Sequence, residues 1–442
     1  MPALTSEVLH PPPGAGDQDL PRGRAWELLV LCARSELSRS GAERVAALIR
    51  EGVSWPELLA LARRHRVVPF LLRHLAALPV PEVPADLLRE LRTEVALNAA
   101  HSRVLVKALR EILLHLEARG IAGLPYKGPV LAHQLYGDVA FRQMTDLDVL
   151  VRPDDLPRAL DVLQCLGYRP RDRLSPRQQR ALLRANNNLP LHGGAGRVSV
   201  ELHWAFATRH PIASLDLDAL RPATRSLRMA GMAVPTFGTE DLLLVLCFHG
   251  ARHLWERLAW LCDVAELVRS HEIDWDQAIS RAERFRSRRV LFLGLRLAQE
   301  LLDAPLPDRI ADRVRSDRGA LRLCHEARAW IGAEDDRPAH SRGLPFHRFQ
   351  LRALDGLGGR ARYLWRALWT PTPEDWQALP LPDPLFPLYY LLRPLRLTTS
   401  YGLLPRSSHR TTTGARSGVP ENPPTAAGTS VLAVPPQARE DS

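Results

Sequence analysis

The stretch FRQMTDLDVLV, residues 141–151, decides the fold, because it carries two carboxylates directly into an apolar, β-favouring run. Alternate residues of a strand point to the same face, so Leu147, Val149 and Val151 fall on one face and Asp146 and Asp148 on the other. Two neighbouring carboxylates raise each other's pKa unless a cation lies between them. The pattern therefore predicts half of a divalent-metal site. It also predicts that a neutral Asn at position 148 leaves the metal-free protein as stable or slightly more stable.

The segments around this strand form a small α/β unit. Residues 120–128 (GIAGLPYKG) predict a short strand that ends in a glycine turn, and residues 129–137 predict a helix that opens with proline. Residues 153–168 predict a second helix with proline and acids at its start. Residues 188–204 alternate apolar and polar side chains around a glycine-rich turn, which predicts a hairpin.

Helical periodicity extends on both sides of this unit, with apolar residues three to four positions apart. The predicted fold class is α+β, with a small mixed-sheet core flanked by N-terminal and C-terminal helical domains. The tail is rich in Pro, Ser, Thr and Gly and buries too little apolar surface to fold. The predicted organisation is a flexible lead-in (1–22), an N-terminal helical domain (23–115), the core (116–237), a C-terminal helical domain (238–400) and a disordered tail (401–442).

Composition excludes several classes of protein. The 5 cysteines are odd in number, widely spaced and lack a C-x-x-C pair, which argues against a disulfide framework and a cysteine-built zinc site. The sequence shows no signal peptide and no apolar run long enough to cross a bilayer, so we expect a cytoplasmic protein that does not contact a membrane.

The net charge of +10 is unevenly distributed. Residues 1–95 hold 12 basic and 12 acidic side chains, whereas residues 96–235 hold 19 basic and 12 acidic ones. Basic surface around an acidic pair suggests a polyanionic ligand that arrives with its own metal. A general preference for arginine, as in GC-rich bacterial coding, explains the overall charge equally well.

Three features of the α/β unit carry chemistry. The Asp146/Asp148 pair is joined by Glu201, which lies on the polar face of the strand RVSVELHW together with Ser199 and His203. Three carboxylates can hold one or two Mg²⁺ ions that also bind substrate phosphates. The third feature is the turn YKGPVL.

In this turn Gly128 leads into a helix N-terminus, which attracts phosphate through its free N–H groups. Lys127 adds a point charge beside this turn. It is one of two lysines in an arginine-rich chain, and either a need for its compact ammonium or chance explains why a lysine is kept here. Arg142 and Gln143 can contact phosphate or shape the turn. Together these features predict nucleotidyl transfer with release of pyrophosphate.

The sequence also resembles the family of uncharacterised nucleotidyltransferases, in the polymerase-β-like superfamily that includes the aminoglycoside nucleotidyltransferases. The resemblance spans roughly residues 25–395 and rests on four stretches: WPELLALARRHRVVPFL, LPYKGPVLAHQLYGDVAFRQMTDLDVLV, VELHW and HGARHLWERLAWLCDVAEL. It places Gly128 at the superfamily glycine, Asp146 and Asp148 at its metal ligands, and Glu201 at its third acid. Pro129 departs from the Gly or Ser of the superfamily motif, and the gap from Gly128 to Asp146 is longer than usual.

The resulting hypothesis is an enzyme that transfers a nucleoside monophosphate from an NTP, with ATP as the first choice, using Mg²⁺ or Mn²⁺. Asp146, Asp148 and Glu201 bind the metal, with Glu201 also able to take the acceptor proton, while Lys127 and Gly128 hold phosphate together with Arg142 and Gln143. The expected acceptor is a small metabolite or a peptide side chain rather than a nucleic acid. Two alternatives remain: a catalytically decayed nucleotide-binding regulatory protein, which Pro129 favours, and an RNA-modifying transferase.

Two further patterns have several readings. The arginine-rich segment 168–184 reads best as a solvated helix face, because it lacks the interleaved aromatic residues of a single-strand nucleic-acid groove. His249 and His253 are four residues apart on a predicted helix, a spacing that can hold zinc with Asp263 as a third ligand. A structural role, or a place in the wall of a binding pocket, accounts for the same spacing.

Overall fold

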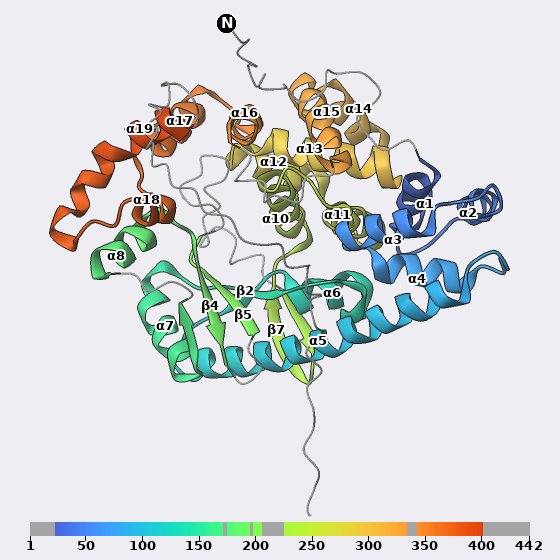
Figure 1. Cartoon of the computed structure of the whole chain (residues 1–442), viewed down its shortest axis with the longest axis horizontal. Coiled ribbons are helices and arrows are strands. Elements are labelled where there is room, and N and C mark those ends of the chain that lie inside the picture. The colour runs from blue at the N-terminus through green and yellow to red at the C-terminus, as the bar shows by residue number, and fades with distance from the viewer. Residues whose placement is uncertain (1–22, 171–174, 195–197, 206–224, 334–342, 401–442) are drawn as a thin grey trace, which may run out of the picture.

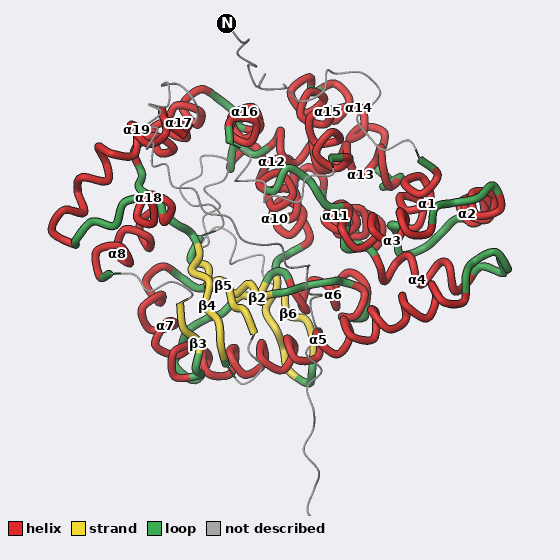
Figure 2. The backbone as a smooth tube through the Cα atoms, in the orientation of Figure 1, coloured by secondary structure: helices red, strands yellow, loops and turns green. Residues whose placement is uncertain are grey.

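A computed structural model describes residues 23–170, 175–194, 198–205, 225–333 and 343–400 (Figure 1). The predicted lead-in and the predicted tail lie outside these residues. A small sheet has the long helix α5 (Ala85–Glu117) and helix α7 (Leu156–Cys165) on one side and most of the remaining helices on the other (Figure 1). Helices dominate the chain and the strands gather in one place (Figure 2), which confirms the predicted α+β class.

The central sheet has five strands in the order β1-β2-β5-β4-β3. Strand β2 runs parallel to β5, and the other neighbours are antiparallel, so the sheet is mixed as predicted. A separate two-stranded ribbon is formed by β6 and β7. The bounds are β1 Leu124–Pro125, β2 Asp146–Leu150, β3 Tyr168–Pro170, β4 Asn188–Gly193, β5 Val198–His203, β6 Arg225–Met229 and β7 Met232–Thr236.

Helices join these strands where the sequence places helix-start signals. Pro lies in the first turn of each joining α-helix, where its missing N–H would have no partner. Ser175 and Gln178 form a capping box at the start of α8. The joining elements are α6 Gly128–Tyr136, η1 Val139–Phe141, η2 Pro153–Asp155, α7 Leu156–Cys165 and α8 Pro176–Ala185.

The N-terminal helices end in one 33-residue helix, α5, that runs along the sheet (Figure 1). Leu87 and Leu91 in its first half belong to the core of the N-terminal helices, whereas Leu109 and Ile112 in its second half pack in the sheet's core. The predicted boundary at residue 115 thus falls near the end of a helix that both regions share. The bounds are α1 Arg24–Cys32, α2 Arg39–Arg50, α3 Trp55–Arg64, α4 Val68–Ala77 and α5 Ala85–Glu117.

The C-terminal helices pack directly against the N-terminal ones. One apolar cluster holds Leu28 and Leu71 together with Leu261 and Leu293, and the backbone N–H of Ala259 donates to the carbonyl of His65. The two helical regions therefore share a core above the sheet. The bounds are α10 Thr239–Arg252, α11 Leu258–Ser270, α12 Trp275–Arg284, α13 Arg288–Leu302, α14 Asp308–Ser316, α15 Arg318–Gly332, α16 Leu344–Ala353, α17 Leu357–Trp369, α18 Pro373–Ala378, η5 Asp383–Leu388 and α19 Tyr389–Ser400.

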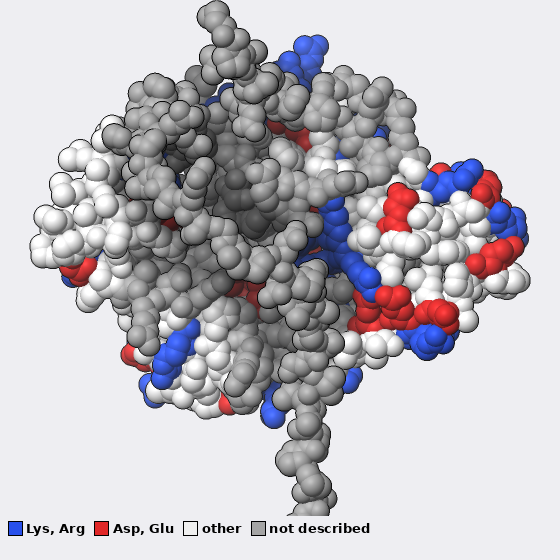
Figure 3. Space-filling model, viewed as in Figure 1, with Lys and Arg blue, Asp and Glu red and all other residues white. Residues whose placement is uncertain are grey.

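Charged side chains of both signs are interspersed over the N-terminal helices (Figure 3). Arg44 pairs with Glu27 and Glu51, and Arg63 pairs with Glu90 and with Glu94. This part of the surface carries no single-sign field. None of the helices within the described ranges is both long and apolar enough to cross a membrane.

Candidate active site

The two faces of the sheet differ in chemistry. Val149 of β2 and Val200 of β5 are fully buried in the cluster that contains α5, whereas the acidic side chains lie on the opposite face. The parallel register of β2 and β5 sets Asp148 beside Glu201 and Asp146 beside Ser199. The period of two in each strand thus collects the carboxylates on one face, and the apolar face holds them in place.

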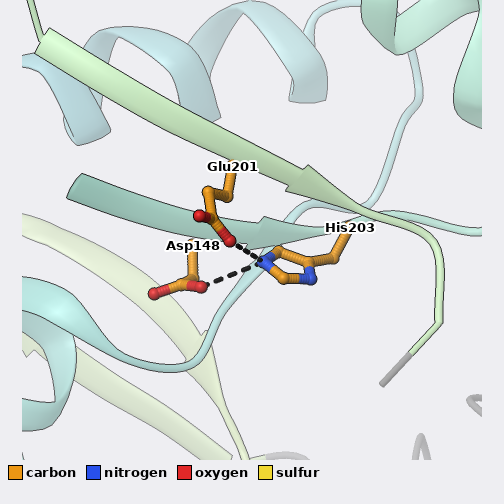
Figure 4. A group of neighbouring side chains, drawn as sticks. All are labelled: Asp148, Glu201 and His203. Atoms are coloured by element: carbon orange, nitrogen blue, oxygen red, sulfur yellow. Dashed lines mark hydrogen bonds and ion pairs between the residues drawn. The ribbon is translucent and has the colours of Figure 1, made fainter. Parts of the chain in front are cut away.

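Asp148 and Glu201 meet around an imidazole at the centre of the site (Figure 4). Nε2 of His203 lies 2.9 Å from Oδ1 of Asp148 and 3.3 Å from Oε2 of Glu201. The candidate ligand atoms of these three residues all lie within 4.8 Å of one another. Asn188, at the start of β4, donates from its amide to Oε2 of Glu201 at 2.7 Å and fixes that carboxylate.

Asp148 carries most of the hydrogen bonds in this site. Its Oδ1 accepts from Nζ of Lys127 at 3.1 Å and from the hydroxyl of Tyr126 at 3.4 Å, in addition to the contact with His203. Burial by itself would raise the pKa of Asp148, but Lys127 and His203 outweigh it and hold the pKa well below its usual range. Asp148 is therefore a stabilised anion in the metal-free protein, so the contacts of Lys127 and His203 lead us to expect that Asn at position 148 costs stability rather than relieves repulsion.

The unfavourable charge falls on Asp146 instead. Burial and the neighbouring charges of Asp148 and Glu201 together raise its pKa to about 6, against the opposing effect of Lys127 and Arg142. The pKa of Glu201 is lowered although burial opposes this, because His203 hydrogen-bonds to it. Asp146 is thus the carboxylate of the group whose charge is least compensated and which takes up a proton most readily as the pH falls.

We expect stabilisation of the protein by Mn²⁺ to weaken as the pH falls below about 6, where Asp146 takes up its proton. A raised pKa favours the folded state below the ordinary value of 3.8, and this contribution is lost as the pH rises through about 6. Above that pH a bound cation restores this contribution to the stability of the folded protein, because it offsets the negative charge of ionised Asp146. Thermal unfolding in EDTA and in MnCl₂ from pH 5 to pH 8 measures this difference. An equal effect of Mn²⁺ at both ends of that range would contradict it.

The glycine turn lies next to this carboxylate. Gly128 has a φ of 59°, and a Cβ at this position would lie 3.4 Å from the backbone oxygen of Asp146. A residue with a side chain would be strained in this left-handed conformation and crowded against β2. Lys127 is the N-cap of α6 and Pro129 lies in its first turn, so the helix N-terminus begins beside the acidic face.

Arg142 and Gln143 contact other partners. Nε of Arg142 donates to Oδ2 of Asp263 at 3.0 Å, and Oε1 of Gln143 accepts from the backbone N–H of Val68 at 3.4 Å. Both side chains thus tie the loop before β2 to the helical regions in this structure. Their predicted contact with phosphate stays a prediction.

The structure adds cations that the sequence did not single out. Burial and the charges of Arg257 and Arg142 together lower the pKa of Arg66 to about 10, against the opposing effect of Asp146. The charge of Arg252 acts on the Tyr126 hydroxyl, whose pKa it lowers against the raising effect of burial. No carboxylate in the described part of the chain forms a salt bridge with Arg66, Arg252 or Arg257. Only the fold brings these arginines toward the acidic face, since Arg66 follows α3, Arg252 ends α10 and Arg257 precedes α11.

Comparison with known proteins gives the family. Residues 51–303 match the family described as uncharacterised nucleotidyltransferase. The chain belongs to this family. Among curated proteins none matches this nucleotidyltransferase. A solved structure, that of the antibiotic-resistance factor ANT(2'')-Ia, is 14% identical to it over 51% of this chain and 98% of that chain, with a TM-score of 0.27. This likeness is too weak to support an argument about the site.

His203 is the site residue that sequence reasoning missed in this nucleotidyltransferase. It lies two residues after Glu201 and therefore on the same face of β5, so the spacing was visible in VELHW. Its contact with Asp148 comes from the parallel pairing of β5 with β2, in which Leu150 is the partner of His203. From the sequence alone, His203 is indistinguishable from an exposed strand residue. Only the pairing of the two strands shows that it lies between two acids.

The histidine pair of α10 does not form a metal site with Asp263 in the described residues, where Asp263 pairs with Arg142 and Tyr136. The rings of His249 and His253 lie 4.7 Å apart, and each lies 5.2 Å from the ring of Trp260. Burial lowers the pKa of His249, and the charge of Lys127 lowers it further, which places this ring group toward the acidic face.

The carboxylates and the imidazole offer a donor set that fits a divalent cation. Two carboxylates from different strands converge with one imidazole nitrogen, and Asp146 on the same face adds a third acid. Oxygen ligands suit Mg²⁺ and Mn²⁺, whereas imidazole is a ligand of several transition metals. Lys127 already contacts Oδ1 of Asp148, so a cation must compete with this ammonium or share the carboxylate with it.

Proposed function

We propose that this nucleotidyltransferase moves a nucleoside monophosphate from a metal-bound NTP, with ATP as the first candidate, to an acceptor and releases pyrophosphate. The proposed acceptor is a small metabolite or a peptide or protein side chain. One observation carries the proposal: Asp148 and Glu201, on adjacent parallel strands, converge beside Asp146 on one face of a sheet whose other face packs in an apolar core. Three acids in this arrangement fit the chemistry of the family to which the chain belongs.

The proposed metal ligands are Asp146, Asp148 and Glu201. Mg²⁺ or Mn²⁺ bound there would neutralise charge on the α-phosphate and on the leaving pyrophosphate. Asp148 is 6% exposed and held by Lys127, which suits a fixed ligand. The side chain of Glu201 is 31% exposed, so it is also open to an acceptor and could take its proton.

The cations around the acidic face would bind the triphosphate. Lys127 and the start of α6 at Gly128 lie beside β2, and the charge of Arg66 acts on Asp146. Helix N-termini and arginines without carboxylate partners are suited to phosphate oxygens. Arg252 and Arg257 extend this positive region toward Trp260, over whose ring Arg257 lies at 5.7 Å.

A catalytically decayed nucleotide-binding protein is the second candidate, and one contact favours it. Lys127 neutralises Asp148 directly, so the metal-free site is already electrostatically satisfied at that carboxylate. Pro129 in the first turn of α6 also removes one N–H that could bind phosphate. A protein of this kind would bind nucleotide without turning it over.

The test uses ATP labelled at either the α- or the γ-phosphate, with an extract of host metabolites and peptides as the source of acceptor. We expect α-label to move onto an acceptor and γ-label to leave as pyrophosphate, in the presence of Mg²⁺ or Mn²⁺ and not in EDTA. Transfer of γ-label onto the acceptor would point to phosphoryl transfer instead, and release of γ-label as inorganic phosphate would point to hydrolysis. Saturable binding of ATP without any divalent-dependent transfer of label would favour the regulatory protein.

A further inference from the structure

A cavity of about 390 Å³ lies apart from the carboxylates, between α8 and the C-terminal helices. One wall is α8, and the other is formed by the residues after α17, by η5 and by the start of α19 (Figure 1). Its volume is in the range of small-molecule sites. The side chains that give it chemical character are Arg177, Arg180, Arg184, Thr370, Phe386 and Tyr390.

Three arginines give the cavity a positive wall. Arg177, Arg180 and Arg184 are spaced by three and four residues, so they share one face of α8. Among the described residues no carboxylate forms a salt bridge with any of them. Arg177 donates to the carbonyls of Asp383 and Pro384, which ties α8 to η5. Within the described ranges Arg180 bonds to the carbonyl of Pro176 through Nε and to nothing else, which leaves its terminal nitrogens to a ligand.

Aromatic side chains from the far end of the chain complete the cavity. Tyr390 is 43% exposed, and its ring lies 6.3 Å from that of Phe386 at an interplanar angle of 75°. Phe386 is buried, and its ring packs against that of Tyr390. The arginine-rich segment itself contains no interleaved aromatic residue, so the combination of guanidinium and ring exists only in the folded protein. A flat ring beside guanidinium groups suits a ligand with an apolar ring and an anionic group.

The cavity is close to the candidate active site along the chain. Ala185 lines the cavity, its carbonyl accepts from Arg366 of α17 at 3.4 Å, and β4 begins three residues later at Asn188. Asn188 holds Glu201 through its amide. Four residues span at most ~14 Å even when fully extended, so the Cα of Arg184 lies within that distance of the Cα of Asn188.

We propose that this cavity binds the acceptor, and that the acceptor is a small molecule that carries a phosphate group next to an aromatic ring. The binding of such a molecule follows from the cavity alone, whereas its role as acceptor rests on the proposed function. The arginines hold the anionic group, Tyr390 contacts the ring, and the end of α8 directs the ligand toward Glu201. On this proposal the three arginines of α8 bind a ligand, whereas the sequence alone favours a solvated helix face.

The test measures binding of phenyl phosphate by calorimetry in EDTA, with phenol and inorganic phosphate as comparisons. We expect phenyl phosphate to bind more tightly than either comparison, because only it uses both the arginines and the ring. The double variant Arg180→Gln/Arg184→Gln should weaken its binding at least ~10-fold, since it loses charge-assisted hydrogen bonds. The matched control Arg103→Gln/Arg110→Gln removes the same charge from an exposed face of α5 and should bind like the wild type.

Several outcomes overturn the proposal. These are no saturable binding of phenyl phosphate to the wild type, equal affinity for inorganic phosphate, or equal weakening in both double variants. Binding of a single-stranded RNA that the α8 variant abolishes, without binding of phenyl phosphate, would assign the cavity to nucleic acid instead. If the α8 double variant does not fold, Tyr390→Leu keeps the apolar volume and removes the ring. Tyr390→Leu should then lower the affinity for phenyl phosphate to that for inorganic phosphate, and an unchanged affinity overturns the proposal.

The role as acceptor site has a separate readout. With the metabolite extract as acceptor source, the α8 double variant should need at least ~10-fold more extract for half-maximal release of pyrophosphate, with an unchanged KM for ATP. An unchanged requirement for extract overturns the acceptor role. If Asp148→Asn releases pyrophosphate as fast as the wild type, the proposed function fails, while the calorimetric result for the cavity still stands.

Discussion

Asp148→Asn is expected to reduce metal-dependent release of pyrophosphate by ~10²–10³-fold, the usual loss when a group that stabilises transition-state charge is removed. It should also lower the free energy of unfolding of the metal-free protein by about 3 kcal/mol, because Lys127 loses the charge of its buried partner. Asp146→Asn is the matched variant two residues away on the same strand face. It should reduce turnover similarly but leave the metal-free protein as stable or ~1 kcal/mol more stable, because the pKa of Asp146 is raised rather than lowered.

The release of pyrophosphate measures turnover, and urea unfolding in EDTA at pH 7.5 measures stability. The two aspartates have the same chemistry and lie on one strand, so the opposite sign of their stability changes tests the charge distribution of the site. The pairing of Asp148 with Lys127 and His203 would be contradicted if both variants were equally stable. The metal-site hypothesis would be contradicted if either variant turned over ATP like the wild type.

Lys127→Met is expected to destabilise the metal-free protein by ~3–5 kcal/mol, because it leaves the buried carboxylate of Asp148 without its cation. Mg²⁺ or Mn²⁺ should then stabilise the variant more than the wild type, since the metal no longer competes with an ammonium on Oδ1. Turnover of ATP should fall as well, because the side chain proposed to bind the triphosphate is gone. Unfolding in urea with and without the metal, together with the KM for ATP, measures these effects.

The chain provides a matched control in its other lysine. Lys107 is exposed on α5, and Lys107→Met should change the free energy of unfolding by no more than ~0.5 kcal/mol. If both methionine variants were equally stable, the ion pair between Lys127 and Asp148 would not support the fold. If Lys127→Met gained no extra stability from the divalent ion, the ammonium and the metal would not share this carboxylate.

Local pattern was sufficient for the elements of the α/β unit. The alternation in β2 and β5 assigned their buried and polar faces, and it placed Asp146 and Asp148 on one side and Glu201 on the polar face of its own strand. Proline marked the helix starts at α6 and α7. These signals are strong because the side-chain period of a strand and the cap of a helix involve only residues that are close in sequence.

The sequence by itself therefore determined the fold class, the family and the carboxylates of the candidate site. Only the tertiary structure decided how the charges are shared, because the parallel pairing of β2 with β5 brings His203 to Asp148 and the turn before α6 brings Lys127 to the same oxygen. It also packed the N-terminal and C-terminal helices into one core, which carries Arg66 toward Asp146. These contacts join residues tens to hundreds of positions apart. Periodicity and caps hold no information about such pairs, since they depend on which apolar faces bury one another.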